Sequence, residues 1–182
     1  YFQRQKKFPK DLFYDEDGIY AVLMSGRDFA AVLVKNGEED RTILSRWKKA
    51  FPEPPAAVNF LGTFFVDTRD GEKLATDVYL PKGEAYKEQK VPSVLIRTPY
   101  GKGERPEQYY RFVQRGYAVV IQDTRGREDS TGEWLPNYYE VEDGDDTLNW
   151  IADQKWSDGQ VSMTGGSYLG YVQWSAAASG NP

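Results

Sequence analysis

The sequence predicts an α/β fold in which an antiparallel hairpin leads into a mainly parallel sheet with flanking helices. Short apolar segments alternate with segments of helical periodicity through residues 91–180, as in parallel strands joined by helices. Ahead of them, β-rich segments at 60–68 and 73–80 flank an Asp-Gly turn at 69–72, which favours a hairpin. In such a sheet, ligands gather where the parallel strands end.

Residues 1–57 differ from the remainder and predict an N-terminal extension whose role the sequence does not assign. Apolar runs at 19–24 and 29–34, separated by Ser-Gly-Arg-Asp, predict a hairpin. Residues 38–49 have the spacing of a short amphipathic helix. Three prolines at 51–55 then favour a linker to the main domain.

The main domain, residues 58–182, continues with alternating elements. Segments 91–97 and 117–122 are short apolar strands without strong alternation, as expected when both faces of a sheet are covered. Between them, residues 106–115 have an apolar face, a proline at the start and a glycine beyond the end, which predicts a helix.

A second helix is predicted from a capping-box pattern. Asn137 precedes Glu140 by three residues, and the apolar Val141, Leu148 and Ile151 follow. An Asp-Gly turn then leads the chain into its last predicted strand.

That last strand, residues 161–164, runs through Gly165 and Gly166 into Ser167, and an apolar helix follows at once. A serine on a glycine-flanked turn from strand to helix is the nucleophile elbow of an α/β-hydrolase. The hydroxyl then stands clear of the sheet, and the first helical turn directs N–H groups at an oxyanion. The sequence therefore predicts Ser167 as a nucleophile; the alternative is a small residue in a tight turn.

Several further motifs occur in order along the main domain. They are Arg-Asp-Gly at 69–71, Arg-Thr-Pro-Tyr at 97–100, Gln-Asp-Thr-Arg-Gly-Arg at 122–127, Trp-Ser-Asp-Gly at 156–159 and Gly-Gly-Ser-Tyr-Leu-Gly at 165–170. Together they resemble the X-Pro dipeptidyl-peptidase and cocaine-esterase-like (CocE/NonD) hydrolases, over about residues 60–182. The resemblance implies the N-terminal part of an α/β-hydrolase. In this family the elbow has a tyrosine directly after the serine and a glycine two positions after that tyrosine, which are Tyr168 and Gly170 here.

The resemblance also implies site residues and a reaction. Tyr100 would donate its phenol O–H to the oxyanion, together with the backbone N–H of Tyr168, while Ser167 forms an acyl-enzyme intermediate. The alternative for Tyr100 is an aromatic ring that only lines the pocket. Substrates implied are carboxylic esters, N-acyl amines, amino acid esters and peptides with proline second. Neither a cofactor nor a metal is implied.

The sequence contains no histidine, the usual base for such a serine. In the resembling enzymes the triad aspartate and histidine lie far downstream of the elbow, so both are expected beyond Pro182. The isolated chain is then expected to be incomplete, weakly active and poorly stable, with an open sheet edge. Two alternatives are a hydrolase-like binding protein that lacks a base, and an interaction module formed by residues 1–57.

Other polar and aromatic residues are interpreted as structural. Asp123 is expected to brace the loop that follows it, and seven aromatic residues are expected mostly in the core: Tyr109, Tyr110, Trp134, Tyr138, Tyr139, Trp150 and Trp156. Five acids lack the spacing of a Ca²⁺ loop and suit the start of a helix: Glu140, Glu142, Asp143, Asp145 and Asp146.

The resemblance implies a small ester, amide or short peptide as the substrate, and composition argues against other partners. A net charge of −5 and the lack of a basic stripe argue against nucleic acid. No apolar run is long enough for a transmembrane segment, and the lack of cysteine excludes disulfides. Residues 1–3 resemble a tag remnant, which leaves cytoplasmic and secreted or periplasmic locations open. Homo-oligomerisation is left open too.

Overall fold

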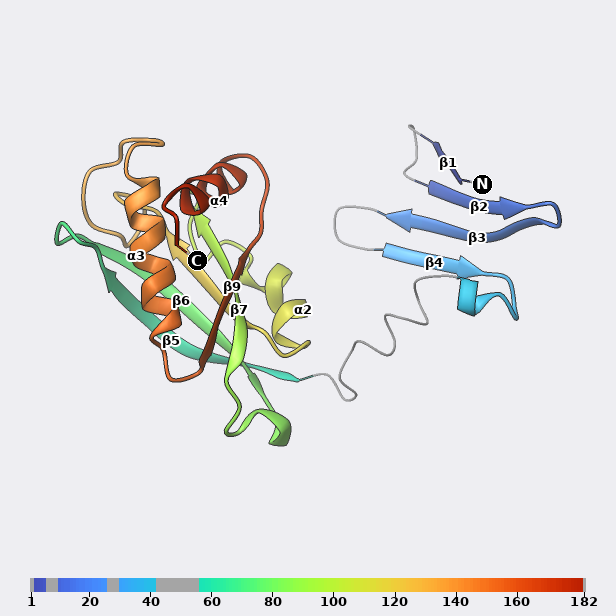
Figure 1. The fold of residues 1–182 in the computed structure, drawn as a ribbon, viewed down its shortest axis with the longest axis horizontal. Helices are drawn as coiled ribbons and strands as arrows, with labels where there is room; N and C mark the ends of the chain where they lie inside the picture. The colour runs from blue at the N-terminus through green and yellow to red at the C-terminus, as the bar shows by residue number, and fades with distance from the viewer. Residues whose placement is uncertain (1, 6–9, 26–29, 42–55, 182) are drawn as a thin grey trace. The chain divides into compact units, whose positions relative to one another are not determined.

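The chain divides into two compact units, residues 1–53 and 54–182 (Figure 1). The computed structural model describes residues 2–5, 10–25, 30–41 and 56–181. The helix predicted at 38–49 is described only as a 3-10 turn, η1 (Glu39–Arg41), and the predicted linker lies outside the described residues.

The first unit is an antiparallel sheet in the order β1-β2-β3-β4. Its strands are β1 (Phe2–Gln5), β2 (Lys10–Asp15), β3 (Gly18–Ser25) and β4 (Ala30–Val34). Pairing of β3 with β4 confirms the predicted hairpin, whose turn is outside the described residues. Arg41 of η1 pairs with Asp15 at 2.6 Å and lies over the Tyr20 ring, which ties η1 to the strands β2 and β3.

The second unit contains a five-stranded sheet in the order β5-β6-β8-β7-β9. The strands are β5 (Ala57–Asp67), β6 (Lys73–Lys82), β7 (Val91–Thr98), β8 (Ala118–Asp123) and β9 (Ser157–Met163). The hairpin of β5 and β6 joins β8 antiparallel, whereas β8, β7 and β9 are parallel. The predicted hairpin leading into a parallel sheet is thus confirmed.

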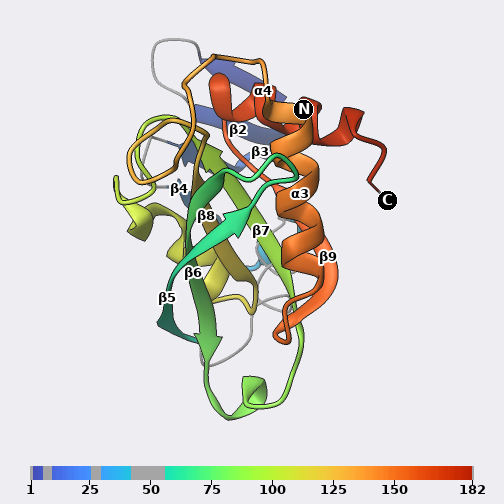
Figure 2. The ribbon, with the colours of Figure 1, turned by 90° about the vertical axis from the view of Figure 1, so that its left-hand side faces the viewer.

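The helical segments of this unit lie between its strands or, for α4, after the last strand. They are η2 (Glu84–Tyr86), η3 (Pro106–Tyr109), α2 (Tyr110–Val113), α3 (Glu140–Ala152) and α4 (Tyr168–Ala178). In Figures 1 and 2, α3 runs alongside the sheet with α4 beside its first turns. None of the helices in the described part of the chain has the length and apolar character needed to span a membrane.

Successive side chains of β7 and β8 point to opposite faces of the sheet, so the core is divided into two clusters, one on each face. Val94 and Ile96 face the side covered by η3 and α2, in a cluster with Val119 and Ile121 of β8. Leu95 faces the other side, in a second cluster completed by α3. Both faces of the central strands are therefore covered, which is why their sequences lack polar alternation.

Two predicted helical features are wrong in detail. The segment 106–115 is a 3-10 turn followed by a single α turn, with left-handed conformations at Arg105 before it and at Gly116 after it. The helix predicted near 137 begins at Glu140, with Tyr139 as N-cap and no side-chain cap bond among the described residues. Asn137 is left-handed at φ 67°. Glu140 does not close a capping box because its carboxylate binds other groups.

A polar layer is buried between the sheet and α3. Arg97, at the end of β7, has no exposed surface, and its Nε donates to Gln122 Oε1 of β8 at 2.8 Å. Its Nη1 lies 2.7 Å from Glu140 Oε2 and donates to the Glu140 carbonyl at 3.2 Å. Thr147 of α3 donates to the same Gln122 oxygen at 3.0 Å. These contacts fix the start of α3 against the ends of β7 and β8.

Replacing Arg97 by methionine is expected to lower the free energy of unfolding by about 3–5 kcal/mol, because the Glu140 carboxylate would remain buried without its counter-charge. Urea unfolding of the full-length gene product measures this. Arg69→Met is the control: Arg69 pairs with Asp146 at 2.7 Å but is 49% exposed, and such pairs contribute little. Equal losses in the two variants would contradict the prediction.

Candidate active site

Ser167 lies at the junction of β9 and α4, and its backbone conformation is unusual. Its φ is 59° and its ψ is −126°, and the residue is exposed. Few non-glycine residues adopt such a conformation, which costs about 1–3 kcal/mol and is found mainly at functional sites. The Ser167 carbonyl accepts the N–H groups of Gly170 and Tyr171, at 2.9 and 3.0 Å, so the helix starts directly behind the side chain.

Glycine at position 165 is required for this turn. Gly165 has a φ of 134°, and a Cβ there would lie 2.5 Å from the Leu169 Cβ. Gly166 is different, because a Cβ at that position would meet no other described atom within 4 Å. The helix therefore folds back over the strand end only if position 165 has no side chain.

Tyr100 and Ser167 follow the ends of neighbouring parallel strands. Strand β7 pairs with β9 in a register that places Leu95 opposite Met163. Tyr100 and Ser167 therefore follow their strands at the same edge of the sheet. Tyr100 is 59% exposed, and its N–H donates to Thr98 Oγ1 at 3.1 Å. The fold therefore brings the segments that carry these two predicted site residues to one edge, where ligands are expected.

Asp123 holds the loop that carries Tyr100. Its buried carboxylate accepts the Lys102 N–H at 2.6 Å and lies 3.1 Å from Lys102 Nζ. Burial would lower the pKa of Lys102, but its bonds to Asp129 and Asp123 outweigh burial and raise that pKa above its usual value. Asp123 also stabilises the loop after β8, as expected, because its backbone carbonyl accepts a hydrogen bond from the Ser130 hydroxyl at 2.8 Å.

Tyr168, directly after Ser167, is anchored through its side chain. Its phenol donates to Glu140 Oε1 at 2.6 Å and accepts the Asn137 N–H at 3.2 Å. Burial and the bond to Glu140 raise the pKa of this phenol well above its usual value. Its N–H belongs to the first turn of α4, where backbone donors have no partner within the helix.

The sequence interpretation missed Arg97 and Glu140 as parts of this site. Their contacts link β7 to α3, and Glu140 continues the link to Tyr168 in α4. One signal was available: Arg97 interrupts an otherwise apolar strand covered on both faces, and a charge in such a position requires a partner. The sequence does not indicate which acid that partner is.

Four of the five acids near the start of α3 are paired with arginines from three other segments. Glu140 pairs with Arg97, Asp143 with Arg125 at 2.5 Å, and Asp145 and Asp146 with Arg69. Within the described ranges, no group of three or more His, Cys, Asp or Glu residues could hold a metal ion. The acidic cluster therefore serves the packing of α3.

The aromatic residues divide between core and surface. Four pack against the two core clusters, as expected: Tyr109, Tyr110, Trp150 and Trp156. Trp134 instead lies 5.6 Å from the Tyr168 ring, and Tyr139 lies under the Arg125 guanidinium. Tyr138 is 70% exposed, which departs from the core expectation.

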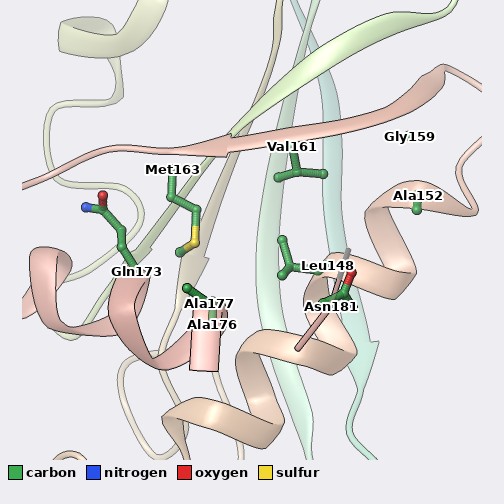
Figure 3. Close-up of a pocket in the computed structure, with 9 residues that line it drawn as sticks. All are labelled: Leu148, Ala152, Gly159, Val161, Met163, Gln173, Ala176, Ala177 and Asn181. Carbon is green, nitrogen blue, oxygen red and sulfur yellow. The ribbon is translucent and has the colours of Figure 1, made fainter. Parts of the chain in front are cut away.

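A cavity of about 320 Å³ lies between α3, β9 and α4. In Figure 3, Val161 points from β9 toward Leu148 of α3, and Met163 points toward Ala177 of α4. Neither Ser167 nor Tyr100 is among the described residues that line it. Tyr100 lines a different cavity of about 260 Å³, together with Lys102 and Asp123.

Comparisons with known proteins agree with the fold of the second unit. A family model described as X-Pro dipeptidyl-peptidase (S15 family) matches residues 70–182. Cocaine esterase from Rhodococcus sp. (strain MB1 Bresler) is 46% identical over 121 residues, which cover 63% of this chain and 20% of that protein. The chain spans about a fifth of the length of the curated relatives that it matches.

Two solved structures share the fold. An α-amino acid ester hydrolase gives a TM-score of 0.58 at 28% identity, covering 69% of this chain and 24% of that one. A CocE/NonD family hydrolase from Staphylococcus aureus gives 0.59 at 25% identity, covering 71% and 29%. The second unit is therefore an α/β-hydrolase fold, described here in its N-terminal part.

Gly165→Ala is expected to destabilise the protein by more than about 1 kcal/mol, because the added Cβ would strike Leu169 and the positive φ disfavours alanine. The matched control is Gly166→Ala, whose Cβ would enter open space. Thermal unfolding of both variants provides the comparison. Equal stability of the two would mean that the turn is not as tight as described.

Proposed function

Because this chain belongs to the X-Pro dipeptidyl-peptidase (S15) family of hydrolases, we propose that it supplies the nucleophile and oxyanion-binding groups of a serine esterase. The observation that carries the proposal is the conformation of Ser167, with an exposed position and a φ of 59° between β9 and α4. This is the geometry that a nucleophile elbow requires. A serine that only fills a tight turn needs no such strain.

The proposed reaction proceeds in two halves. The Ser167 oxygen attacks the acyl carbon while its proton passes to a base, and the oxyanion accepts hydrogen bonds from the Tyr100 O–H and the Tyr168 N–H. The carbon–oxygen bond to the alcohol then breaks, and the alcohol departs with the proton. Water attacks the acyl-enzyme through the same kind of intermediate and releases the carboxylic acid, which restores Ser167.

The base is not a histidine of these 182 residues, since the sequence contains none. It therefore lies outside them or is a different type of residue. Asp123 is not a candidate, because both of its carboxylate oxygens bind Lys102. The proposed contribution of this chain is limited to attack and oxyanion stabilisation.

Carboxylic esters are the proposed substrate class. Cocaine esterase, at 46% identity, and an α-amino acid ester hydrolase, at 28%, both support ester cleavage by their names. X-Pro peptides are the second candidate, favoured by the description of the matching family model. Comparing hydrolysis of nitrophenyl esters with that of X-Pro nitroanilides separates the two.

A binding protein without catalytic activity is the alternative function, and the lack of histidine favours it. It predicts that Ser167 does not react with activated phosphonates. The two functions therefore differ in a single measurement.

A fluorophosphonate probe is expected to label Ser167 in the full-length gene product, because the reagent requires an activated hydroxyl. Peptide mapping locates the label, and Ser167→Ala should abolish it. Ser162→Ala is the control, since Ser162 is exposed on the same strand but lies outside the turn. An unlabelled full-length protein supports the binding alternative.

Tyr100→Phe is expected to lower kcat for a nitrophenyl ester about 100- to 1000-fold with little change in KM, because one oxyanion donor is lost. Tyr117→Phe is the control, because Tyr117 precedes β8 and so lies at the opposite edge of the sheet. A Tyr100→Phe enzyme with unchanged kcat would restrict Tyr100 to lining the pocket.

A further inference from the structure

We propose that the phenol of Tyr168 is a positioning group, which Glu140 holds so that the N–H of the same residue stays aimed at the oxyanion. The inference rests on the proposed roles of Ser167 and of the Tyr168 N–H. It adds a function for a side chain that otherwise only follows the nucleophile in sequence.

The first observation is where the bond is made. Tyr168 is the first residue of α4, and its phenol donates to Glu140 Oε1 at 2.6 Å. Backbone groups in the first turn of a helix lack partners within the helix, and helix ends fray for that reason. A hydrogen bond from this side chain restrains the residue that carries the donor N–H, and with it the turn at Ser167.

The second observation is that Glu140 is itself fixed. Its Oε2 lies 2.7 Å from Arg97 Nη1, and Arg97 is fully buried and bound to Gln122 of β8. The Tyr168 phenol is therefore tied through one carboxylate to the interior of the sheet. The phenol also accepts the Asn137 N–H at 3.2 Å, but only the Glu140 carboxylate connects it to β7 through Arg97.

The third observation connects the two proposed oxyanion donors. Arg97 lies in β7, three residues before Tyr100, and the Tyr100 N–H is held by Thr98 at the end of that strand. Both proposed donors, the Tyr168 N–H and the Tyr100 phenol, are thus connected to strand β7. An oxyanion hole works only if its donors are placed before charge develops, and this link places them.

The chemistry of the bond suits a permanent restraint. A phenol is protonated at neutral pH even at its usual pKa, and the pKa of Tyr168 is raised further, so the phenol donates to the carboxylate throughout that range. Such charge-assisted bonds are short and stronger than neutral ones.

Tyr171 provides a matched control on the same helix. Its phenol donates to the Asn137 carbonyl at 3.1 Å, in a loop, and its side chain is exposed. Removing the Tyr171 hydroxyl deletes its bond to the Asn137 carbonyl, whereas removing the Tyr168 hydroxyl deletes the bond to Glu140 and the bond from the Asn137 N–H. Only the loss at Tyr168 frees α4 from Glu140.

The test compares Tyr168→Phe with Tyr171→Phe in the full-length gene product, at a temperature where both are folded. For a nitrophenyl ester, Tyr168→Phe is expected to lower kcat about 10- to 100-fold with KM nearly unchanged, as for a small misplacement of a catalytic donor. Inhibition by a boronic acid, which forms a tetrahedral serine adduct, should weaken by a similar factor. Tyr171→Phe should leave both quantities nearly unchanged.

A second variant changes Glu140, the hydrogen-bond partner of Tyr168, without removing its negative charge. Glu140→Asp keeps a carboxylate near Arg97 but shortens the side chain, so the bond to Tyr168 is lost. If the bond is the relevant interaction, the double variant is expected to be no slower than the slower single variant. Losses that multiply in the double variant would overturn the proposal.

The outcomes separate this inference from the proposed function. If Ser167→Ala retains activity, the proposed function is wrong and the inference falls with it. If Ser167 is labelled by a phosphonate but Tyr168→Phe behaves like Tyr171→Phe, only the positioning role is wrong. A loss in Tyr168→Phe that appears in kcat and boronic acid binding, with unchanged labelling of Ser167, supports it.

Discussion

The buried charge of Arg97 is the constraint on which the arrangement of the second unit depends. A guanidinium without exposed surface costs several kcal/mol unless an opposite charge and hydrogen-bond acceptors surround it. Glu140 supplies that charge at 2.7 Å, and Gln122 supplies an acceptor. Because Glu140 is the first residue of α3, neutralising Arg97 determines where this helix begins relative to β7.

Other acids in the first turns of α3 pair with arginines from two further segments. These ion pairs hold α3 at one edge of the sheet. Arg125 follows β8 and binds both Asp143 of α3 and Asp70 of the β5–β6 turn. Acids near a helix N-terminus are favoured by the helix dipole, and Glu140 and Asp143 in the first turn of α3 each pair with an arginine as well. The segments that carry Tyr100 and Ser167 end at this edge. The charge pairs thus form the support for the candidate site.

The strain at Ser167 is tolerated because three neighbouring features offset it. Gly165 allows the helix to fold back on the strand, and the Ser167 carbonyl accepts two N–H groups of α4. Tyr168 then ties the first turn to Glu140. A conformation that costs about 1–3 kcal/mol persists only where its surroundings determine it in this way. The exposed position of the serine is therefore a product of its surroundings as well as of the local motif.

The sequence alone determined most strands of the second unit, the β5–β6 hairpin and the turn at Ser167, because apolar periodicity and glycine placement act over a few residues. The Asp-Gly turn predicted before residues 161–164 is wrong, because these two residues lie within β9, which begins at Ser157. It misjudged the capping box at Asn137, since Glu140 is recruited by Arg97 instead of by its own helix end. Only the tertiary structure decided the link from Arg97 through Glu140 to Tyr168, which joins residues 43 and 28 positions apart. Contacts between residues so far apart in the sequence depend on how the sheet and helices pack, and the local spacing of residues does not predict them.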